Sequence, residues 1–88
     1  MAWKVKVTET ADKQLAALGN QEEKRIRKFL RERVAPCDNP RDFGDPLLGN
    51  FSGLWRYRVG NFRIICDIQD EEILVLVLKI GHRREVYK

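Results

Sequence analysis

Three arginines lie close together in the middle of the chain, in a stretch that contains no acidic residue. They are Arg56, Arg58 and Arg63, and no aspartate or glutamate occurs between Phe51 and Cys66. Guanidinium groups stay charged at neutral pH, and their planar forks match the geometry of phosphate oxygens. Arginines held side by side in this way would bind a phosphate group or another anion.

The spacing of these arginines predicts that they share one face of a β-hairpin. Gly60 and Asn61 form a two-residue turn signal because both residues tolerate positive φ. Such a turn places Arg58 directly opposite Arg63. Opposed like charges cost up to ~1 kcal/mol relative to a neutral pair, so folding alone would not favour them, whereas an anionic ligand would. The other face would carry the apolar residues of the hairpin, which are Trp55, Tyr57, Ile64 and Cys66.

The end of the chain supplies further candidate side chains. A last strand that runs back antiparallel returns residues 79–84 to the Gly60 end of the sheet, beside Arg63. The acids at 70–72 then lie about 23 Å away at the rise of a strand, beyond the screening length of about 8 Å at physiological salt. We therefore expect a phosphate-binding cluster at one end of one sheet face. Its expected members are Arg58, Arg63, His82 and Arg83, with Arg56 and Tyr87 as further candidates.

The elements that must position this cluster follow from hydrophobic periodicity. Residues 3–8 alternate as a strand, and Thr8 or Thr10 can cap a helix that ends at Gly19. Asn20 can cap a second helix. The apolar positions of the two helices are Ala11, Leu15 and Leu18, and Ile26, Phe29, Leu30 and Val34. The charged faces of the second helix are interpreted as solvated.

Three strands are expected after an irregular connection rich in proline and glycine, over Leu54–Val59, Phe62–Gln69 and Glu72–Ile80. The order β-α-α-β-β-β predicts an α+β fold, in which a helical hairpin packs on a mostly antiparallel four-stranded sheet. With a turn at Asp70-Glu71, Leu74, Leu76 and Leu78 share the face of Arg63 and need cover from the chain or a partner. A shift of one residue would exchange them for Val75 and Val77.

Composition limits the kind of protein that this sequence can encode. The 88 residues, 43% hydrophobic and 34% charged, fit one globular domain over residues 1–88. The net charge of +4 permits a polyanionic partner. The alternating first residues lack the apolar run of a secretory signal or membrane span, so we expect a cytoplasmic protein without membrane contact. Two cysteines, Cys37 and Cys66, and a single histidine predict reduced thiols, no metal site and no cofactor.

Two segments carry a resemblance to a known family. The run from Leu54 to Ile65 resembles the hairpin of RelE-type toxins, with its "basic-x-basic … Y/F-R" pattern, and Ile80-Gly81-His82-Arg83-Arg84-Glu85-Val86-Tyr87 is similar to the "GHRREVY" tail common among them. The length and the order of elements also fit, so the resemblance extends over the whole chain. It places the chain in the RelE/ParE superfamily, whose RelE members cleave mRNA in the ribosomal A site and whose ParE members poison DNA gyrase.

The resemblance implies a RelE-like fold and a set of site residues. It implies catalytic roles for Arg63, Arg83 and Tyr87, which match the RelE pattern, and favours a nuclease over a gyrase poison. The expected RNA-binding residues are Arg56, Arg58, Lys79 and Arg84. The chain departs from the pattern at 56, 58 and 82, where the family has lysines, and it is two residues shorter between Gly81 and Tyr87.

These residues suggest a mechanism, because RNA carries its own nucleophile in the 2′-hydroxyl. A nuclease has to deprotonate that hydroxyl, stabilise the extra charge on phosphorus and protonate the leaving oxygen. Arginine suits the second task, so Tyr87 and His82 are the candidates for proton transfer, with Glu85 as a third. Nearby arginines should lower the pKa of both Tyr87 and His82. Both assignments remain open at this stage.

The family resemblance also implies partners. We expect a toxin of a type II toxin–antitoxin system that cleaves ribosome-bound mRNA and so inhibits translation, with a cognate antitoxin, the ribosome and mRNA as its partners. The alternatives are a ParE-like gyrase poison and a non-catalytic basic module that binds RNA or protein.

Overall fold

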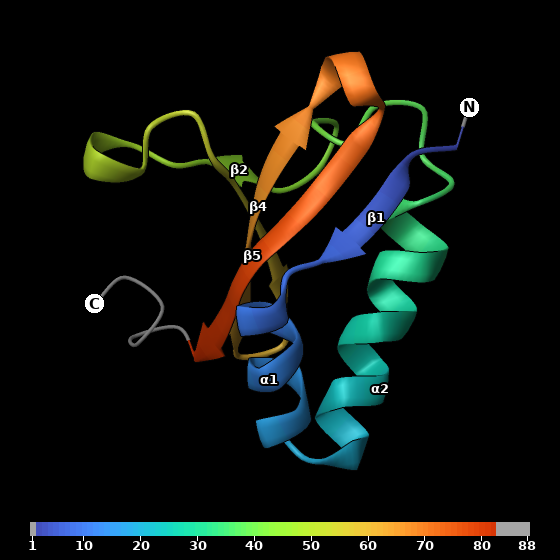
Figure 1. Ribbon diagram of the computed structural model, residues 1–88, viewed down its shortest axis with the longest axis vertical. Helices are drawn as coiled ribbons and strands as arrows, with labels where there is room; N and C mark the ends of the chain where they lie inside the picture. Colours follow the sequence, from blue (N-terminus) through green and yellow to red (C-terminus); the bar gives the residue numbers. More distant parts are fainter. Residues whose placement is uncertain (1, 83–88) are drawn as a thin grey trace.

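A computed structural model describes residues 2–82 of the chain (Figure 1). In chain order, its strands and helices are β1 (Lys4–Val7), α1 (Glu9–Ala17), α2 (Asn20–Phe29), β2 (Asp45–Pro46), β3 (Trp55–Val59), β4 (Phe62–Gln69) and β5 (Leu74–His82). A π-helical turn, Leu30–Val34, continues α2, and two 3-10 turns cover Gly49–Phe51 and Asp70–Glu72. No helix in this part of the chain is long and apolar enough to cross a lipid bilayer.

The strands form one mixed sheet in the order β1-β5-β4-β3-β2. β1 pairs parallel with β5, and the other three pairs are antiparallel. The α+β class and the mostly antiparallel sheet are therefore confirmed, but the prediction of four strands was wrong. The fifth strand, β2, has only two residues, one of them Pro46, so it leaves no alternating pattern that the sequence could reveal.

The helical hairpin begins and turns where the sequence predicts, but the prediction that Asn20 caps α2 was wrong, because Asn20 is its first residue and the cap is Gly19, without a side-chain hydrogen bond. Thr8 caps α1, because its Oγ1 accepts a hydrogen bond of 3.2 Å from the backbone N–H of Ala11. Gly19 adopts φ +95° between the helices, a conformation that side-chain-bearing residues rarely take. This glycine lets α2 turn back against α1 within a short connection.

The core lies between the helical hairpin and one face of the sheet. The predicted hairpin register is confirmed, with Tyr57 opposite Ile64 and Trp55 opposite Cys66. Tyr57, Ile64 and Cys66 are fully buried. The buried residues that the helices contribute are Ala11, Leu15, Ile26, Leu30 and Val34, as the periodicity predicts.

β5 differs from the predicted last strand in its limits and in its pairing. It begins at Leu74 because residues 70–72 form a 3-10 turn that ends at Ile73, a left-handed residue with φ +49°. A β-bulge then interrupts its pairing with β4, since Ile65 pairs with Lys79 while Cys66 pairs with Val77. Leu78 is thus an extra residue, and the side chains beyond it change faces.

The two faces of β5 are occupied differently before the bulge. Val75 and Val77 are fully buried under the helices, whereas Leu74 and Leu76 lie half-buried on the other face, as the predicted parity requires. On this second face, Leu47 packs against Ile65 in a small separate cluster, which Phe51 and Leu54 join. The segment around Gly49–Phe51 projects on the side of the sheet away from α2 (Figure 1). We call the sheet surface away from the helices the outer face.

Candidate nucleic-acid interface

The centre of the predicted site is an arginine pair on the outer face. Arg58 of β3 is directly opposite Arg63 of β4, as the Gly60-Asn61 turn predicts. Arg58 is exposed and forms no ion pair within residues 2–82, whereas Arg63 is half-buried. Like charges directly opposite each other on neighbouring strands are destabilising by themselves, and guanidinium groups bind anions such as phosphate well.

Arg56 differs from this pair because it has an acidic partner in its own chain. Its Nη2 atom lies 3.1 Å from Oδ2 of Asp45, and the two side chains are 21% and 49% exposed. β2 brings this carboxylate beside β3, since Asp45 pairs with Arg56 across the two strands. The expectation that no carboxylate lies near the arginines was therefore wrong for Arg56. Because Asp45 is already its partner, Arg56 is less suited than Arg58 to bind a further anion.

The end of β5 places one predicted site residue, Lys79, on the outer face and another, His82, on the helix side of the sheet. Lys79 is exposed and pairs with Ile65, so it lies on the same face as the arginines. His82 pairs with Phe62, and the two rings meet edge to face at 6.0 Å between centroids. Phe62 packs against the core, on the helix side of the sheet. The placement of His82 with the arginines was thus wrong, because the bulge at Leu78 reverses the alternation.

Three residues assigned to the site by sequence, Arg83, Arg84 and Tyr87, lie outside the described residues, as does Glu85. Within residues 2–82, no three His, Cys, Asp or Glu side chains come together in a way that could hold a metal ion.

Two cations of the second helix segment lie near the arginine pair, and the sequence analysis did not assign them to the site. A Cβ built on Gly60 would lie 2.8 Å from Nη1 of Arg25, so this guanidinium lies against the β3–β4 turn. Arg33 lies with its Cζ 5.5 Å from the ring centre of Phe43. The signal for Arg25 was its i, i+3 spacing from Lys28 on α2. Arg33 is five residues beyond Lys28, a spacing that gives no such signal in an α-helix, and it lies in the π-helical turn Leu30–Val34.

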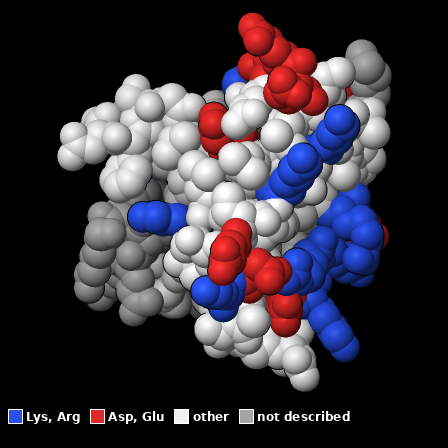
Figure 2. Space-filling model, in the orientation of Figure 1, with Lys and Arg blue, Asp and Glu red and all other residues white. Residues whose placement is uncertain are grey.

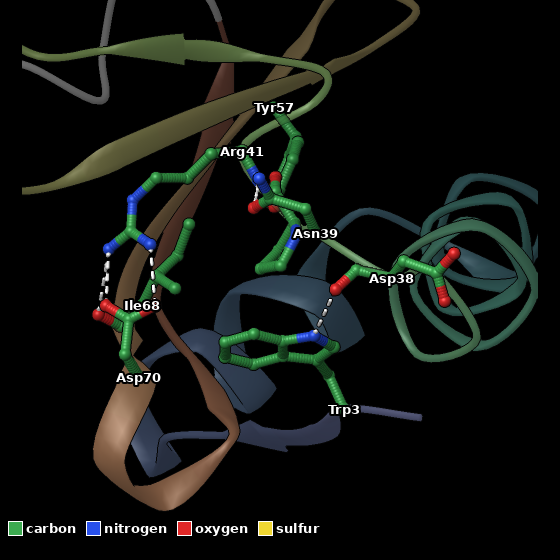
Figure 3. Close-up of polar contacts among 8 residues, drawn as sticks. Trp3, Asp38, Asn39, Arg41, Tyr57, Ile68 and Asp70 are labelled. Carbon is green, nitrogen blue, oxygen red and sulfur yellow. Dashed lines mark hydrogen bonds and ion pairs between the residues drawn. The ribbon is translucent and has the colours of Figure 1, made fainter. Parts of the chain in front are cut away.

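The opposite end of the sheet is acidic, and one of its acids, Asp70, is paired with an arginine of the chain. Figure 2 shows acidic side chains gathered at the connection between β4 and β5, and basic ones over α2. Arg41 reaches this acidic end and binds Asp70 through both prongs, at 2.8 and 3.0 Å (Figure 3). This pairing lowers the pKa of the Asp70 carboxyl, mainly through the hydrogen bond from Arg41. One arginine is therefore held by an acid of the same chain at this end, where Glu71 and Glu72 add further negative charge.

Taken together, the basic end can bind and polarise a phosphate, because guanidinium donors stabilise charge that develops on phosphate oxygens. The chain is thus an α+β domain with cationic donor groups at one end of an open sheet face, an arrangement suited to an anionic ligand.

Comparison with known structures identifies the same fold in toxins. The toxin–antitoxin complex RelBE2 from Mycobacterium tuberculosis is similar with a TM-score of 0.85 and 26% identity, covering 97% of this chain and 95% of that chain. A mutant of the Escherichia coli toxin RelE in the free state gives a TM-score of 0.76 at 24% identity, over 99% and 92% of the two chains. The second likeness shows the fold alone.

Sequence comparison shows the family. The toxin RelG of Mycobacterium tuberculosis is 33% identical over 49 residues, so the match spans 56% of this chain and little more than half, 56%, of that relative. A sequence model of the ParE toxin family of type II toxin–antitoxin systems matches residues 5–87. The chain therefore belongs to this family and is a type II toxin of the RelE/ParE superfamily, as the resemblance of its hairpin and tail implied.

Proposed function

We propose that this toxin is a ribosome-dependent endoribonuclease that cleaves mRNA in the ribosomal A site and so inhibits translation. The observation that carries the proposal is the direct opposition of Arg58 and Arg63 on an exposed sheet face, in a chain of the RelE/ParE superfamily. Opposed arginines on one exposed face favour an anionic ligand, and a ribonuclease has to hold a phosphate group.

In this proposal the arginines hold the scissile phosphate. Arg63, together with Arg83, contacts the phosphate oxygens that gain charge as the 2′-oxygen attacks. Arg58 and Lys79 bind neighbouring phosphates, since both are exposed on the outer face. Arg84 is assigned to the same task, whereas Arg56 contributes mainly by its pairing with Asp45.

The proposed reaction needs two proton transfers. A base takes the proton from the 2′-hydroxyl, the bond from O2′ to phosphorus forms, the bond from phosphorus to O5′ breaks, and O5′ gains a proton. The products are a 2′,3′-cyclic phosphate and a free 5′-hydroxyl. Of the two candidates for the base we favour Tyr87, because the register of β5 directs His82 to the side of Phe62. The arginines would lower the pKa of the phenol by stabilising the phenolate.

A site with no pair of histidines or carboxylates is chemically sparse, which supports the dependence on the ribosome. The ribosome would hold the mRNA so that the 2′-oxygen, phosphorus and leaving oxygen are in line, and positioning of this kind lowers the barrier strongly. We therefore expect weak activity on free RNA.

We also propose a cognate antitoxin as the partner of the free toxin. RelBE complexes contain an antitoxin together with the toxin. On this chain, Leu74 and Leu76 lie half-buried on the outer face, flanked in register by Lys4 and Lys6 of β1. An antitoxin segment that combines apolar and acidic residues fits such a surface.

The proposed function is tested by in vitro translation followed by primer extension on the mRNA. We expect breaks within the A-site codon that require both ribosomes and toxin. The same mRNA without ribosomes should remain largely intact. Rapid cutting of naked RNA at many positions would contradict the dependence on the ribosome.

A second function is kept because the matching family model is that of ParE toxins. A gyrase poison would produce gyrase-linked breaks in supercoiled DNA and leave mRNA intact. Incubation of the toxin with gyrase and plasmid, beside the translation assay, therefore separates the two. Gyrase-linked breaks without A-site cleavage would replace the ribonuclease proposal, and neither result would leave a non-catalytic binding module.

A further inference from the structure

A groove runs along the β3 edge of the sheet, between α2 with its continuation and the segment that leads into β2. It consists of two adjoining hollows of about 460 and about 290 Å³, which share Phe29 and Arg33 as lining residues. The lining also includes Arg25, Lys28, Phe43 and Arg58. We call this feature the α2–β3 groove. Nothing in the proposed reaction uses it apart from Arg58.

The floor of the groove is aromatic. Phe43 lies 5.0 Å from the ring of Tyr57 and 6.1 Å from that of Phe29, measured between centroids, and Phe29 lies 5.8 Å from Tyr57. Tyr57 is fully buried, while Phe29 and Phe43 are half-buried and line the groove, with the guanidinium of Arg33 5.5 Å from the ring centre of Phe43. Half-buried rings that line a groove offer a surface on which a nucleobase can stack.

The walls of the groove are basic. Arg25, Lys28, Arg33 and Arg58 are all exposed. Two carboxylates also line the groove, but Asp45 is paired with Arg56 and Glu32 lies 3.6 Å from Arg31. The groove therefore presents a row of cations, with its acids engaged by other arginines and with Arg25 also 4.0 Å from Glu22 of its own helix.

The groove is continuous with the proposed phosphate site. Arg58 lines its β3 side and at the same time faces Arg63 across the hairpin. Arg25 lies against Gly60, at the turn that joins the two strands carrying this pair. A strand of RNA whose phosphate is bound at Arg63 could pass Arg58 and enter the groove without crossing an uncompensated acidic side chain of the groove lining.

We infer that the α2–β3 groove binds single-stranded RNA, as the path of the message on one side of the cleaved phosphate. Cations along the walls would contact successive phosphates, and Phe43 and Phe29 would receive a base. Charge complementarity and groove-lining aromatic rings together fit single-stranded nucleic acid, which combines a polyanionic backbone with flat apolar bases. This inference rests on the proposed function for the identity of the strand, but its binding test does not.

The test measures the affinity of the full-length toxin for a fluorescent RNA oligonucleotide whose 2′-hydroxyls are methylated, so that it cannot be cleaved. The groove variant is Lys28→Ala with Arg33→Ala. The matched control is Lys13→Ala with Lys24→Ala, which removes the same charge from exposed positions of the helical hairpin outside the groove lining. We expect the groove variant to weaken binding about tenfold and to lower the salt slope by about 1.4, the value for two lost phosphate contacts on a single strand. The control should change binding much less.

A third variant, Phe43→Leu, addresses stacking, because leucine keeps the apolar volume without the flat ring. It should weaken binding with little change in the salt slope. Circular dichroism and thermal unfolding of all variants report whether the fold is retained. Unchanged affinity of a folded groove variant, or equal losses in groove and control variants, would overturn the inference.

Two further outcomes are distinguishable. If the groove variant loses affinity for an antitoxin peptide and keeps its affinity for RNA, the groove is a protein-binding surface and the inference is wrong. If wild-type toxin binds RNA through the groove and yet produces no A-site breaks, the ribonuclease proposal fails and the groove stands.

Discussion

The arginines at the two ends of the sheet differ in the charge of the side chains that face them. At the β4–β5 connection, Arg41 is bound through both prongs by Asp70 and also donates to the carbonyl of Ile68 (Figure 3). At the β3–β4 turn, Arg58 faces a second arginine, Arg63, and makes no ion pair within the described part of the chain. One end carries an arginine paired with an acid, and the other places two arginines opposite each other across neighbouring strands.

This difference distinguishes arginines that stabilise the fold from arginines that are available to bind a ligand. An exposed ion pair contributes at most about 1 kcal/mol, yet it leaves no net charge for a ligand. An opposed arginine pair lowers stability by a similar amount and provides a field that an anion can neutralise. Arg56 is intermediate, because it is a neighbour of Arg58 but forms an ion pair with Asp45 of β2. Variants at these positions should therefore change activity and stability in different proportions.

The largest effect should come from removing the proposed phosphate-binding arginines, in the variant Arg63→Ala with Arg83→Ala. Loss of a single charge-stabilising donor typically lowers rates by about 100- to 1,000-fold, so we expect cleavage on the ribosome to be abolished. Thermal unfolding should show no loss of stability, since Arg63 lies outside the helix-packed core and its removal also relieves the repulsion from Arg58. The control is Arg41→Ala at the acidic end, which should keep full cleavage. Persistent cleavage by the double variant would overturn the site assignment.

Replacing one member of the opposed pair, by Arg58→Gln, should change activity and stability in opposite directions. Glutamine keeps most of the side-chain length and removes the repulsion from Arg63. We expect the free energy of unfolding in urea to rise by up to about 1 kcal/mol, and cleavage to fall. A loss of stability would mean that the two guanidinium groups do not repel each other in the folded chain.

A smaller effect is expected for Asp45→Asn, which leaves Arg56 without its carboxylate. Because the two side chains are partly exposed, the free energy of unfolding should fall by about 0.5–1 kcal/mol. The matched control is Asp42→Asn, at an exposed position in the same segment, which should change stability less. Equal effects of the two variants in urea unfolding would argue against a structural role for the Asp45–Arg56 pair.

The smallest effect should be a pH dependence at the acidic end. Arg41 lowers the pKa of Asp70 in the folded chain below its unfolded value, which is about 3.9 for a free aspartate. The contribution of this pair is therefore complete above about pH 4 and is lost as the pH falls through the folded pKa. Asp70→Asn should flatten this part of the melting temperature profile between about pH 2 and 5. Glu71→Gln, at the neighbouring exposed position, should not.

Local features of the sequence were enough to predict the hairpin and the core. The Gly60-Asn61 turn fixes the register of residues close to it, so the pairing of Arg58 with Arg63 followed from counting alone. Helical spacing likewise identified the buried stripe that contains Ile26, Leu30 and Val34. Both signals depend only on neighbours along the chain, and this is why they were reliable. Membership of the toxin superfamily was visible for the same reason, from two contiguous motifs.

Features that depend on distant contacts were decided by the tertiary structure. β2 exists only because Asp45–Pro46 is held against β3. The same pairing places Asp45 beside Arg56. The bulge at Leu78 is an adjustment of β5 to β4 that no local pattern announces, and it moves His82 to the helix side of the sheet. The α2–β3 groove needs two elements packed side by side. The sequence by itself thus determined which residues pair across a tight turn, whereas only packing decided which face each distant side chain finally occupies.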